Sequence, residues 1–336
     1  MTGSRLRAVA DLALYLVARA LLFLLALLPR RAGLAIGRGI GRAFAILSPR
    51  HRRLALENLE RAFGPSLPPE ARGRIAGSAF AHLGMLCADA AYLPRLLRAP
   101  TARLAVYEGV EHLRTAAAEG RGVLVFSGHF GHWELIAMLQ PRLGVPFSMV
   151  VRPLNNRRLE GHLARLRARA GNRLIAKRDA ARGVLRALRE GGAVALLIDQ
   201  NVRGDGGVFV DYFGVPASTT PALATFALKT GAPIIPVFSW PLADGRVKIA
   251  YGAPVTSRRT GSLPEDIRTL TQACTARIED EVRRRPELWF WMHNRWRTRP
   301  PAGRVEDPRT AAGPVVPAPG TGGPDAAGPG VAGAWR

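Results

Sequence analysis

The feature that most limits what this chain can fold into is an alternation of short apolar runs with amphipathic segments after residue 104. Each run is too short for a buried helix and long enough for a strand covered on both faces. Helix-like segments at about 131–141, 156–171, 179–190 and 219–230 separate them. This order predicts an α/β fold with a sheet between layers of helices. The predicted strands are 123–127, 147–151, 193–198, 208–210, 233–238 and the stretch within 245–252.

The segments around this α/β region divide the chain of 336 residues into three parts. Residues 1–50 are predicted to form a membrane anchor with an interfacial basic segment. Residues 51–300 form the main domain, which begins with helical patterns and ends with a long helix and an aromatic run. Residues 301–336 are rich in Pro, Gly and Ala without apolar periodicity, which predicts a disordered tail.

The anchor prediction rests on the apolar segment from Leu12 to Leu28, which Arg19 alone interrupts. Its length is at the lower limit for crossing a bilayer, which needs about 20 residues. A buried core helix is the alternative. Seven arginines between Arg30 and Arg53 favour a cytoplasmic location for everything downstream. The following segment, 32–47, has glycines four residues apart, a pattern suited to close helix packing or to a position in the headgroup plane.

The charge balance predicts an anionic partner. Lys and Arg number 48 against 25 Asp and Glu, a formal charge of +23. Nucleic acid, an anionic membrane surface, and an acidic protein or phosphorylated substrate all fit such a surface. The two cysteines, Cys87 and Cys274, lie far apart and match no disulfide or zinc spacing.

The stretch "RGVLVFSGHFGHWEL" (121–135) holds the strongest candidate for chemistry. A buried strand is followed by a turn with His129 and then by Glu134. Gly128 and Gly131 permit a turn that brings the two side chains together, as a base and its carboxylate partner require. Two structural histidines at a strand end are the alternative, and spacing alone does not favour either interpretation. A metal site is disfavoured because the spacing matches no metal motif.

The same stretch resembles the first motif, H-x4-E, of the lysophospholipid acyltransferase superfamily, and in particular of its lipid A biosynthesis acyltransferase branch. The resemblance extends over roughly residues 5–300. Further blocks of the branch follow in the expected order, namely "EGVEHLRTAAAEGRGVLV", "VVRPLNN", "LLIDQNVRGDGGVFVDYFGVPASTTPALATFALKTGAPIIPVF" and "RRPELWFWMHNRWRTRP". At position 132 the branch often has asparagine where this chain has His132, and the spacing favours His129 as the base.

This resemblance implies a glycerolphosphate-acyltransferase-like mixed sheet covered by helices, with an N-terminal membrane-anchor helix. It implies an enzyme on the cytoplasmic face of the inner membrane that moves a fatty acyl chain from acyl carrier protein to a hydroxyl of a phosphorylated lipid A precursor. It requires no cofactor and no metal. His129 is then the general base and Glu134 its orienting carboxylate. The predicted substrate-binding residues are Arg152, Asp199, Gln200, Asn201 and Arg203, of which Asp199, Gln200 and Asn201 are equally suited to supporting the catalytic loop.

Two other functions remain as alternatives. The first keeps the chemistry but uses acyl-CoA as donor and a phosphatidylinositol mannoside or lysophospholipid as acceptor. The second is a membrane-tethered nucleic-acid binder, which needs aromatic side chains interleaved with a basic patch. The aromatic residues instead gather at 289–296, so no nucleic-acid partner is expected.

Overall fold

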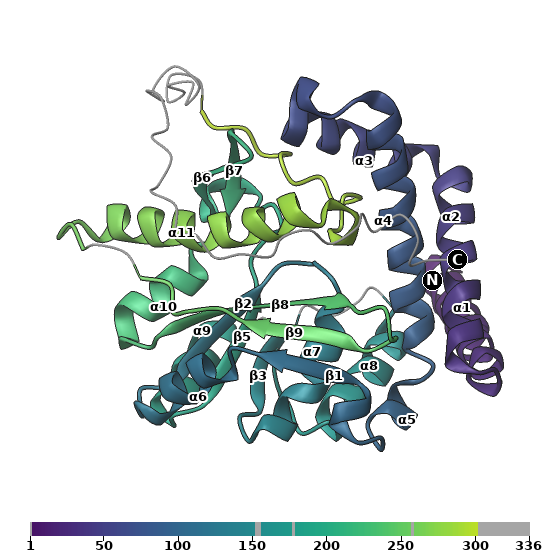
Figure 1. Cartoon of the computed structure of the whole chain (residues 1–336), viewed down its shortest axis with the longest axis horizontal. Coiled ribbons are helices and arrows are strands. Elements are labelled where there is room, and N and C mark those ends of the chain that lie inside the picture. The colour runs from purple at the N-terminus through teal and green to yellow at the C-terminus, as the bar shows by residue number, and fades with distance from the viewer. Residues whose placement is uncertain (1, 152–155, 177–178, 257–258, 302–336) are drawn as a thin grey trace, which may run out of the picture.

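A computed structural model describes residues 2–151, 156–176, 179–256 and 259–301. A mixed sheet with helices on both faces forms the centre of the molecule (Figure 1), which confirms the predicted α/β fold. Arg152 and the predicted tail beyond residue 301 lie outside the described residues.

The sheet has seven strands in the order β1-β9-β8-β2-β5-β3-β4. Every pairing in it is parallel except that of β8 with β9. A separate antiparallel hairpin joins β6 and β7. The strands are β1 Ala105–Glu108, β2 Val123–Ser127, β3 Phe147–Val151, β4 Arg173–Ala176, β5 Ala193–Leu197, β6 Val208–Tyr212, β7 Val215–Thr219, β8 Ile234–Pro241 and β9 Val247–Tyr251.

All six predicted strands are present, and β1, β4 and β7 are additional. β1 and β4 are four-residue strands at the two edges of the sheet. Edge strands are short and carry polar side chains because one side has no partner strand. Neither strand therefore shows the apolar run that marks a central one.

Helices precede the sheet and cover it. The α-helices are α1 Thr2–Leu27, α2 Arg30–Leu47, α3 Pro49–Phe63, α4 Pro69–Asp89, α5 Leu93–Leu96, α6 Val110–Ala118, α7 Trp133–Leu139, α8 Arg157–Arg169, α9 Ala180–Arg189, α10 Ala222–Thr230 and α11 Leu263–Arg284. Short 3-10 helices lie at Gly64–Ser66, Thr101–Arg103, Gln140–Leu143, Gly204–Gly206 and Pro286–Leu288.

The central strand β2 shows how the sheet divides the core in two. Val123 and Val125 pack into one apolar cluster, which includes side chains of α6 and α7. Leu124 and Phe126 pack into the other, which includes side chains of α10 and α11. Successive side chains of a strand point to opposite faces, so a continuous apolar run is required where both faces are buried.

The glycine stripe of α2 lies against α4. A Cβ on Gly41 would come within 2.1 Å of the Phe80 carbonyl oxygen, and one on Gly84 of α4 within 2.1 Å of the Gly37 carbonyl oxygen. The two backbones therefore touch directly, the close helix packing that the spacing predicted. Figure 1 shows α2 outside α4, on the side of the molecule where α1 also lies.

The first helix is mostly exposed. Its segment Ala8–Leu27 is long and apolar enough to cross a membrane, and only 6% of it is buried; the described residues contain one such helix. The alternative of a buried core helix does not fit this exposure.

Candidate active site

The carboxyl ends of two neighbouring strands bring His129 and Asp199 together. β2 and β5 are parallel, and Ser127 lies opposite Leu197 in their register. Two residues further along each chain come His129 and Asp199. The side chains that follow adjacent parallel strands meet at the same edge of the sheet, where α/β proteins place their ligand sites.

The Asp199 carboxylate binds the His129 side chain and backbone together. Its Oδ1 lies 2.8 Å from His129 Nδ1, and its Oδ2 accepts a hydrogen bond of 2.7 Å from the His129 backbone N–H. Trp289 Nε1 donates to the same Oδ2 over 2.8 Å. An ionised carboxylate only accepts, so Nδ1 carries the proton and Nε2 is left with its lone pair. His129 is therefore fixed in the tautomer that a general base requires.

Burial and charge act on this pair in opposite directions. Burial lowers the pKa of His129, but the charge of Asp199 and its hydrogen bond outweigh burial, so the His129 pKa is raised above its ordinary 6.5. Burial alone would raise the pKa of Asp199, because it disfavours the charged carboxylate. The His129 charge and the three hydrogen bonds from His129 and Trp289 instead lower the Asp199 pKa to about 2. Asp199 is thus an anion at neutral pH and stabilises the imidazolium that forms when His129 takes up a proton.

The structure places the carboxylate of Glu134, the predicted orienting residue, against another side chain than His129. Its carboxylate is bound by the guanidinium of Arg167 on α8, with one hydrogen bond of 3.1 Å from Nε and a second, shorter one from Nη2. Among the described contacts, the carboxylate bound to His129 is that of Asp199 instead. Glu134 acts on His129 through its charge, which also raises the His129 pKa. Its position at the start of α7, beyond the turn, separates it from Nδ1.

A tight turn between His129 and α7 depends on Gly131. This residue has φ +57°, and a Cβ there would lie 1.7 Å from the carbonyl oxygen of Ser239. Only glycine fits both conditions. The turn leads directly into His132, which caps α7.

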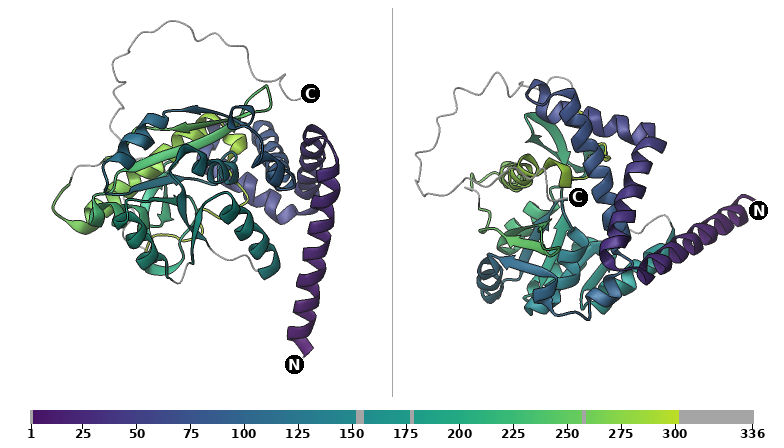
Figure 2. Two further views of the ribbon diagram at one scale, coloured as in Figure 1. Left: turned by 90° about the horizontal axis from the view of Figure 1, so that it is seen from below. Right: turned by 45° about the vertical axis from the view of Figure 1, so that its right-hand side comes forward.

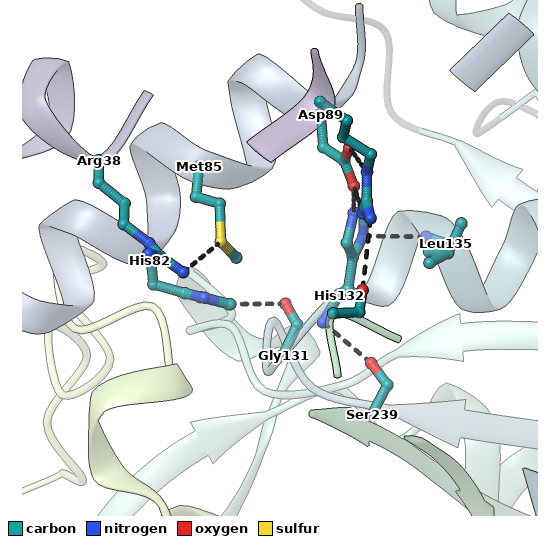
Figure 3. A network of polar contacts seen from close by, with 10 residues as sticks. Arg38, His82, Met85, Asp89, Gly131, His132, Leu135 and Ser239 are labelled. Atoms are coloured by element: carbon teal, nitrogen blue, oxygen red, sulfur yellow. Dashed lines mark hydrogen bonds and ion pairs between the residues drawn. The ribbon is translucent and has the colours of Figure 1, made fainter. Parts of the chain in front are cut away.

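His132 is a structural residue in this arrangement. Its Nε2 lies 2.8 Å from Asp89 Oδ2, and its Nδ1 accepts a hydrogen bond from the Leu135 backbone N–H. Figure 3 shows the imidazole between these two partners, with the His132 backbone N–H directed at Ser239. Both ring nitrogens are occupied inside the protein, so His132 has no free lone pair for a substrate.

Asp89 and His82 of α4 hold this turn in place, Asp89 through His132 and His82 directly. Asp89 is held in turn by Arg30 of α2. Arg30 binds both carboxylate oxygens of Asp89 at 2.7 Å. Burial alone raises the pKa of Asp89, but its hydrogen bonds to Arg30 and His132 hold it well below its ordinary value. His82 Nε2 lies 3.1 Å from the Gly131 carbonyl oxygen, and burial lowers the His82 pKa to about 4. Neutral His82 therefore donates to the turn.

The loop after β5 contains the remaining predicted binding residues. Gln200 Nε2 lies 3.3 Å from His129 Nε2 and so donates to the lone pair of the base. Asn201 is occupied by the protein, because its side chain exchanges hydrogen bonds with Thr298 and its backbone N–H donates to His293 Nε2. Arg203 is exposed to solvent. Asp199 thus binds the base at Nδ1, Gln200 reaches it at Nε2, and Asn201 supports the loop.

A cavity of about 300 Å³ opens beside His129. It lies where side chains of β2, β3, β5 and α7 face one another, and Glu134, Arg167 and Gln200 lie on its wall. Ser127 also lines it, and the buried Ser127 hydroxyl has no hydrogen-bond partner among the described residues. Its apolar lining residues are Val125, Phe126, Trp133, Ile136, Ala137, Phe147, Met149, Val150, Val151, Ala195, Leu196, Leu197 and Val237.

Several residues of the site were not found from the sequence. Asp89 and His82 lie on α4, about 40 residues before the motif, and nothing in their surroundings marks them as partners of it. Arg167 is one of several arginines on α8. Trp289 belongs to the aromatic run at 289–296, which the sequence places at the end of the main domain. The described residues contain no group of three or more His, Cys, Asp or Glu side chains that is able to hold a metal ion.

Comparison with known proteins shows the family to which the chain belongs. Residues 4–298 match the family model described as bacterial lipid A biosynthesis acyltransferase. The lipid A biosynthesis palmitoleoyltransferase of Escherichia coli K12 is 29% identical over 266 residues, which cover 79% of this chain and 85% of that protein. The lipid A biosynthesis lauroyltransferase of the same organism is 26% identical over 284 residues, covering 83% and 90%.

A more distant relative is the phosphatidylinositol mannoside acyltransferase of Mycobacterium tuberculosis CDC 1551. It is 25% identical over 195 residues, which cover 57% of this chain and 60% of that protein. The family model, in contrast, spans the anchor, the His129 turn, the β5 loop and the aromatic run. The chain therefore belongs to the bacterial lipid A biosynthesis acyltransferase family and is an O-acyltransferase.

Proposed function

We propose that this enzyme transfers a fatty acyl chain from acyl carrier protein to a hydroxyl of a phosphorylated lipid A precursor, with His129 as general base. The observation that carries the proposal is the position of His129. Its Nδ1 is held by buried Asp199, and its Nε2 lies at an apolar cavity.

The reaction follows from this geometry. The acceptor hydroxyl replaces the Gln200 amide at His129 Nε2 and gives up its proton as its oxygen attacks the thioester carbonyl carbon. The tetrahedral intermediate collapses, the carbon–sulfur bond breaks, and the imidazolium returns the proton to the departing thiolate. Asp199 stabilises the imidazolium between the two proton transfers. An ester and a free thiol result, so no cofactor is needed.

The cavity provides a binding site for the acyl chain. Its lining is apolar from β2 to α7, and its polar residues gather near His129 and Arg167. Burying each methylene of the chain contributes about 0.8 kcal/mol. A chain seated there directs its thioester carbonyl toward the polar end, next to the base.

Ser127 is the residue we assign to the oxygen of that carbonyl. Its hydroxyl is buried, belongs to a cavity-lining residue and is unpaired among the described residues. A donor of this kind stabilises the negative charge that develops on the carbonyl oxygen in the tetrahedral intermediate.

The identity of donor and acceptor rests on the relatives. The Escherichia coli relatives are named for lipid A biosynthesis and align over most of their length. The phosphatidylinositol mannoside acyltransferase aligns over a smaller share, and a mannoside acceptor with acyl-CoA as donor is the second candidate. Exposed Arg203, in the loop that also carries Gln200, and Arg152 are the residues we assign to acceptor phosphates, because guanidinium groups bind phosphate in a bidentate manner. An acyl carrier protein donor places the catalytic domain on the cytoplasmic face of the inner membrane.

The test is acyl transfer from an acyl carrier protein thioester to a lipid A precursor in detergent. His129→Ala should lower kcat by about a thousandfold, as expected for loss of a general base. His112→Ala, a histidine of α6 outside the cavity lining, is the control and should retain full activity. Full transfer by a folded His129→Ala enzyme would disprove the assignment. Transfer to a mannoside alone would favour the second candidate.

A further inference from the structure

The apolar helix α1 lies along the body of the protein over much of its length. The backbone carbonyl of Asp11 accepts a hydrogen bond of 2.6 Å from Asn156 Nδ2 at the N-cap of α8. Two turns later, Arg19 lies 3.1 Å from a ring nitrogen of His162 on α8. The α1 backbone at Asp11 and the side chain of Arg19 therefore both contact α8, and α1 and α8 run side by side.

The other end of α1 is also held by the body. Tyr92 donates its hydroxyl proton to the Leu25 carbonyl over 2.5 Å, and Arg95 donates to the Ala26 carbonyl over 2.5 Å. Arg30, at the start of α2, is bound to Asp89. Contacts at both ends thus fix the orientation of α1 relative to the catalytic domain.

This orientation conflicts with a helix that crosses a bilayer. If residues 8–27 crossed, α8 beside Asp11 and Arg19 would lie at hydrocarbon depth. Arg158, Arg165 and Arg169 of α8 are exposed and form no ion pair with any residue that the structure describes. Their helical spacing places them on the His162 face, and the charges of Arg165 and Arg169 contribute to lowering the His162 pKa, after burial and Arg19. Unpaired arginines are strongly disfavoured in hydrocarbon.

Exposed apolar side chains of α1 and α2 lie on the same side of the molecule. α2 packs on α4 through its glycines, and beside this stripe it exposes Ile36, Ile40, Phe44, Ile46 and Leu47, of which Phe44 also contacts Phe80 of α4. α1 exposes Leu14, Val17, Leu21 and Leu24 among others. In Figure 1 both helices lie at the right-hand side, outside α4, and Figure 2 shows α1 running along this side with its N-terminal end beyond the body.

We propose that α1 and α2 together form a monotopic membrane-binding surface, in which α1 lies in the plane of an anionic bilayer and does not cross it. The exposed apolar faces of the two helices enter the headgroup and acyl boundary. Arg158, Arg165 and Arg169 contact lipid phosphates beside α1. The choice of a bilayer as partner rests on the proposed function, and the orientation rests on the contacts above. α8 also carries Arg167 of the cavity wall, so a lipid acceptor in the same leaflet has a short route to His129.

The depth of α1 in vesicles tests the orientation. Single cysteines at positions 10 to 24 of the full-length Cys87→Ser protein are nitroxide-labelled in vesicles of phosphatidylcholine and phosphatidylglycerol. The collision ratio of oxygen to a nickel chelate then gives the depth of each label. A helix in the plane produces a depth that oscillates every 3.6 residues around a constant shallow value. A smooth increase to a maximum near Val17, followed by a decrease, would overturn the proposal.

Lipid binding tests the arginines separately. Replacing Arg158, Arg165 and Arg169 together by glutamine should weaken binding to phosphatidylglycerol-containing vesicles by about a hundredfold, since each basic residue near such a surface contributes about fivefold. The matched control replaces Arg182, Arg186 and Arg189, which are exposed on α9, and should bind like wild type. Equal losses in the two variants, or no loss in the first, would contradict the assignment.

Acyl transfer measured in detergent on the same samples separates this inference from the proposed function. Active enzyme with a bilayer-crossing α1 leaves the function standing and removes the inference. Inactive enzyme with a shallow, oscillating depth profile along α1 leaves the inference standing and removes the proposed function.

Discussion

At the scale of single residues, the site is built from a base and the groups that restrict it. The Asp199 carboxylate fixes the tautomer of His129, Trp289 fixes the carboxylate, and Gly131 allows the backbone to turn away immediately after the base. Asp199 and Trp289 are buried and His129 is only partly exposed, so these contacts remove freedom from the imidazole before substrate binds. Such preorganisation lowers the cost of reaching the transition state.

Ser127 provides a prediction at this scale. Ser127→Ala should lower kcat by about a hundredfold and leave KM for the acyl donor nearly unchanged, because a carbonyl-oxygen donor acts mainly in the transition state. Ser127→Thr keeps the hydroxyl and should recover part of the loss. Steady-state kinetics with a fixed acceptor provide the measurement. Similar kcat values for the alanine variant and wild type would rule out the assigned role.

The prediction of the site from sequence also succeeds and fails at this scale. His129 and Gln200 lie together at the cavity, as their positions after two predicted strands required. Glu134 was assigned to His129 because only a local partner is visible in a linear motif. Asp199 lies 70 residues away, and the register of β2 with β5, which places it at Nδ1, is set by pairing that no local pattern encodes.

At the scale of elements, the glycine contact between α2 and α4 holds the N-terminal helices on the domain. A side chain at position 41 would force the two backbones apart. α4 is not free to move away, because its Asp89 and His82 are bound to the catalytic turn. The neighbouring Gly39 faces open space. Gly41 and Gly39 therefore form a matched pair, because both lie within α2 and Gly41 alone of the two contacts α4.

Gly41→Ala should therefore destabilise the protein by about 1–3 kcal/mol through overpacking, since its Cβ would lie 2.1 Å from the Phe80 carbonyl oxygen. Gly39→Ala should be neutral or stabilising by up to about 1 kcal/mol, because alanine favours helix more than glycine does. Chemical denaturation in detergent measures both. If Gly41→Ala is as stable as Gly39→Ala, the described packing of α2 on α4 is incorrect.

The elements themselves were largely predictable. Central strands show continuous apolar runs because both faces are buried, and all six predicted strands are present. β1 and β4 were missed because these edge strands bury less, and β7 was missed because its buried end, 217–219, includes two polar residues and shows no apolar run. The apolar character of α1 is visible in its composition, but composition contains no information on the contacts of α1 with α8.

At the scale of the whole molecule, one buried polar group joins the N-terminal helices to the catalytic turn. Asp89 binds Arg30 at the corner between α1 and α2 and His132 at the start of α7. Both partners depend on its negative charge. The orientation of α1 and the position of His129 are therefore parts of one structure.

Asp89→Ala should lower the free energy of unfolding at pH 7 by about 3 kcal/mol, because it leaves a partly buried guanidinium and a buried imidazole unpaired. The Asp89 pKa is depressed in the folded state, so its contribution is complete above its unfolded pKa near 4 and is lost as the pH falls toward the folded value. Denaturation at pH 7 and at progressively lower pH provides the measurement, with Asp244→Ala at an exposed turn as control. A stability of Asp89→Ala equal to that of the control at pH 7 would contradict this role.

The most direct test of the central claim is the pH dependence of kcat/KM for acyl transfer by wild type and by Asp199→Asn. Neutral His129 is the active form and its pKa is raised above 6.5, so wild-type activity should fall as the pH decreases through a value above 6.5. Removing the carboxylate charge destabilises the imidazolium. The asparagine variant should lose activity by about a hundredfold or more at its plateau, and its acidic limb should move to lower pH. An unchanged acidic limb, or full activity, in Asp199→Asn would contradict the account of His129 as a base held by Asp199.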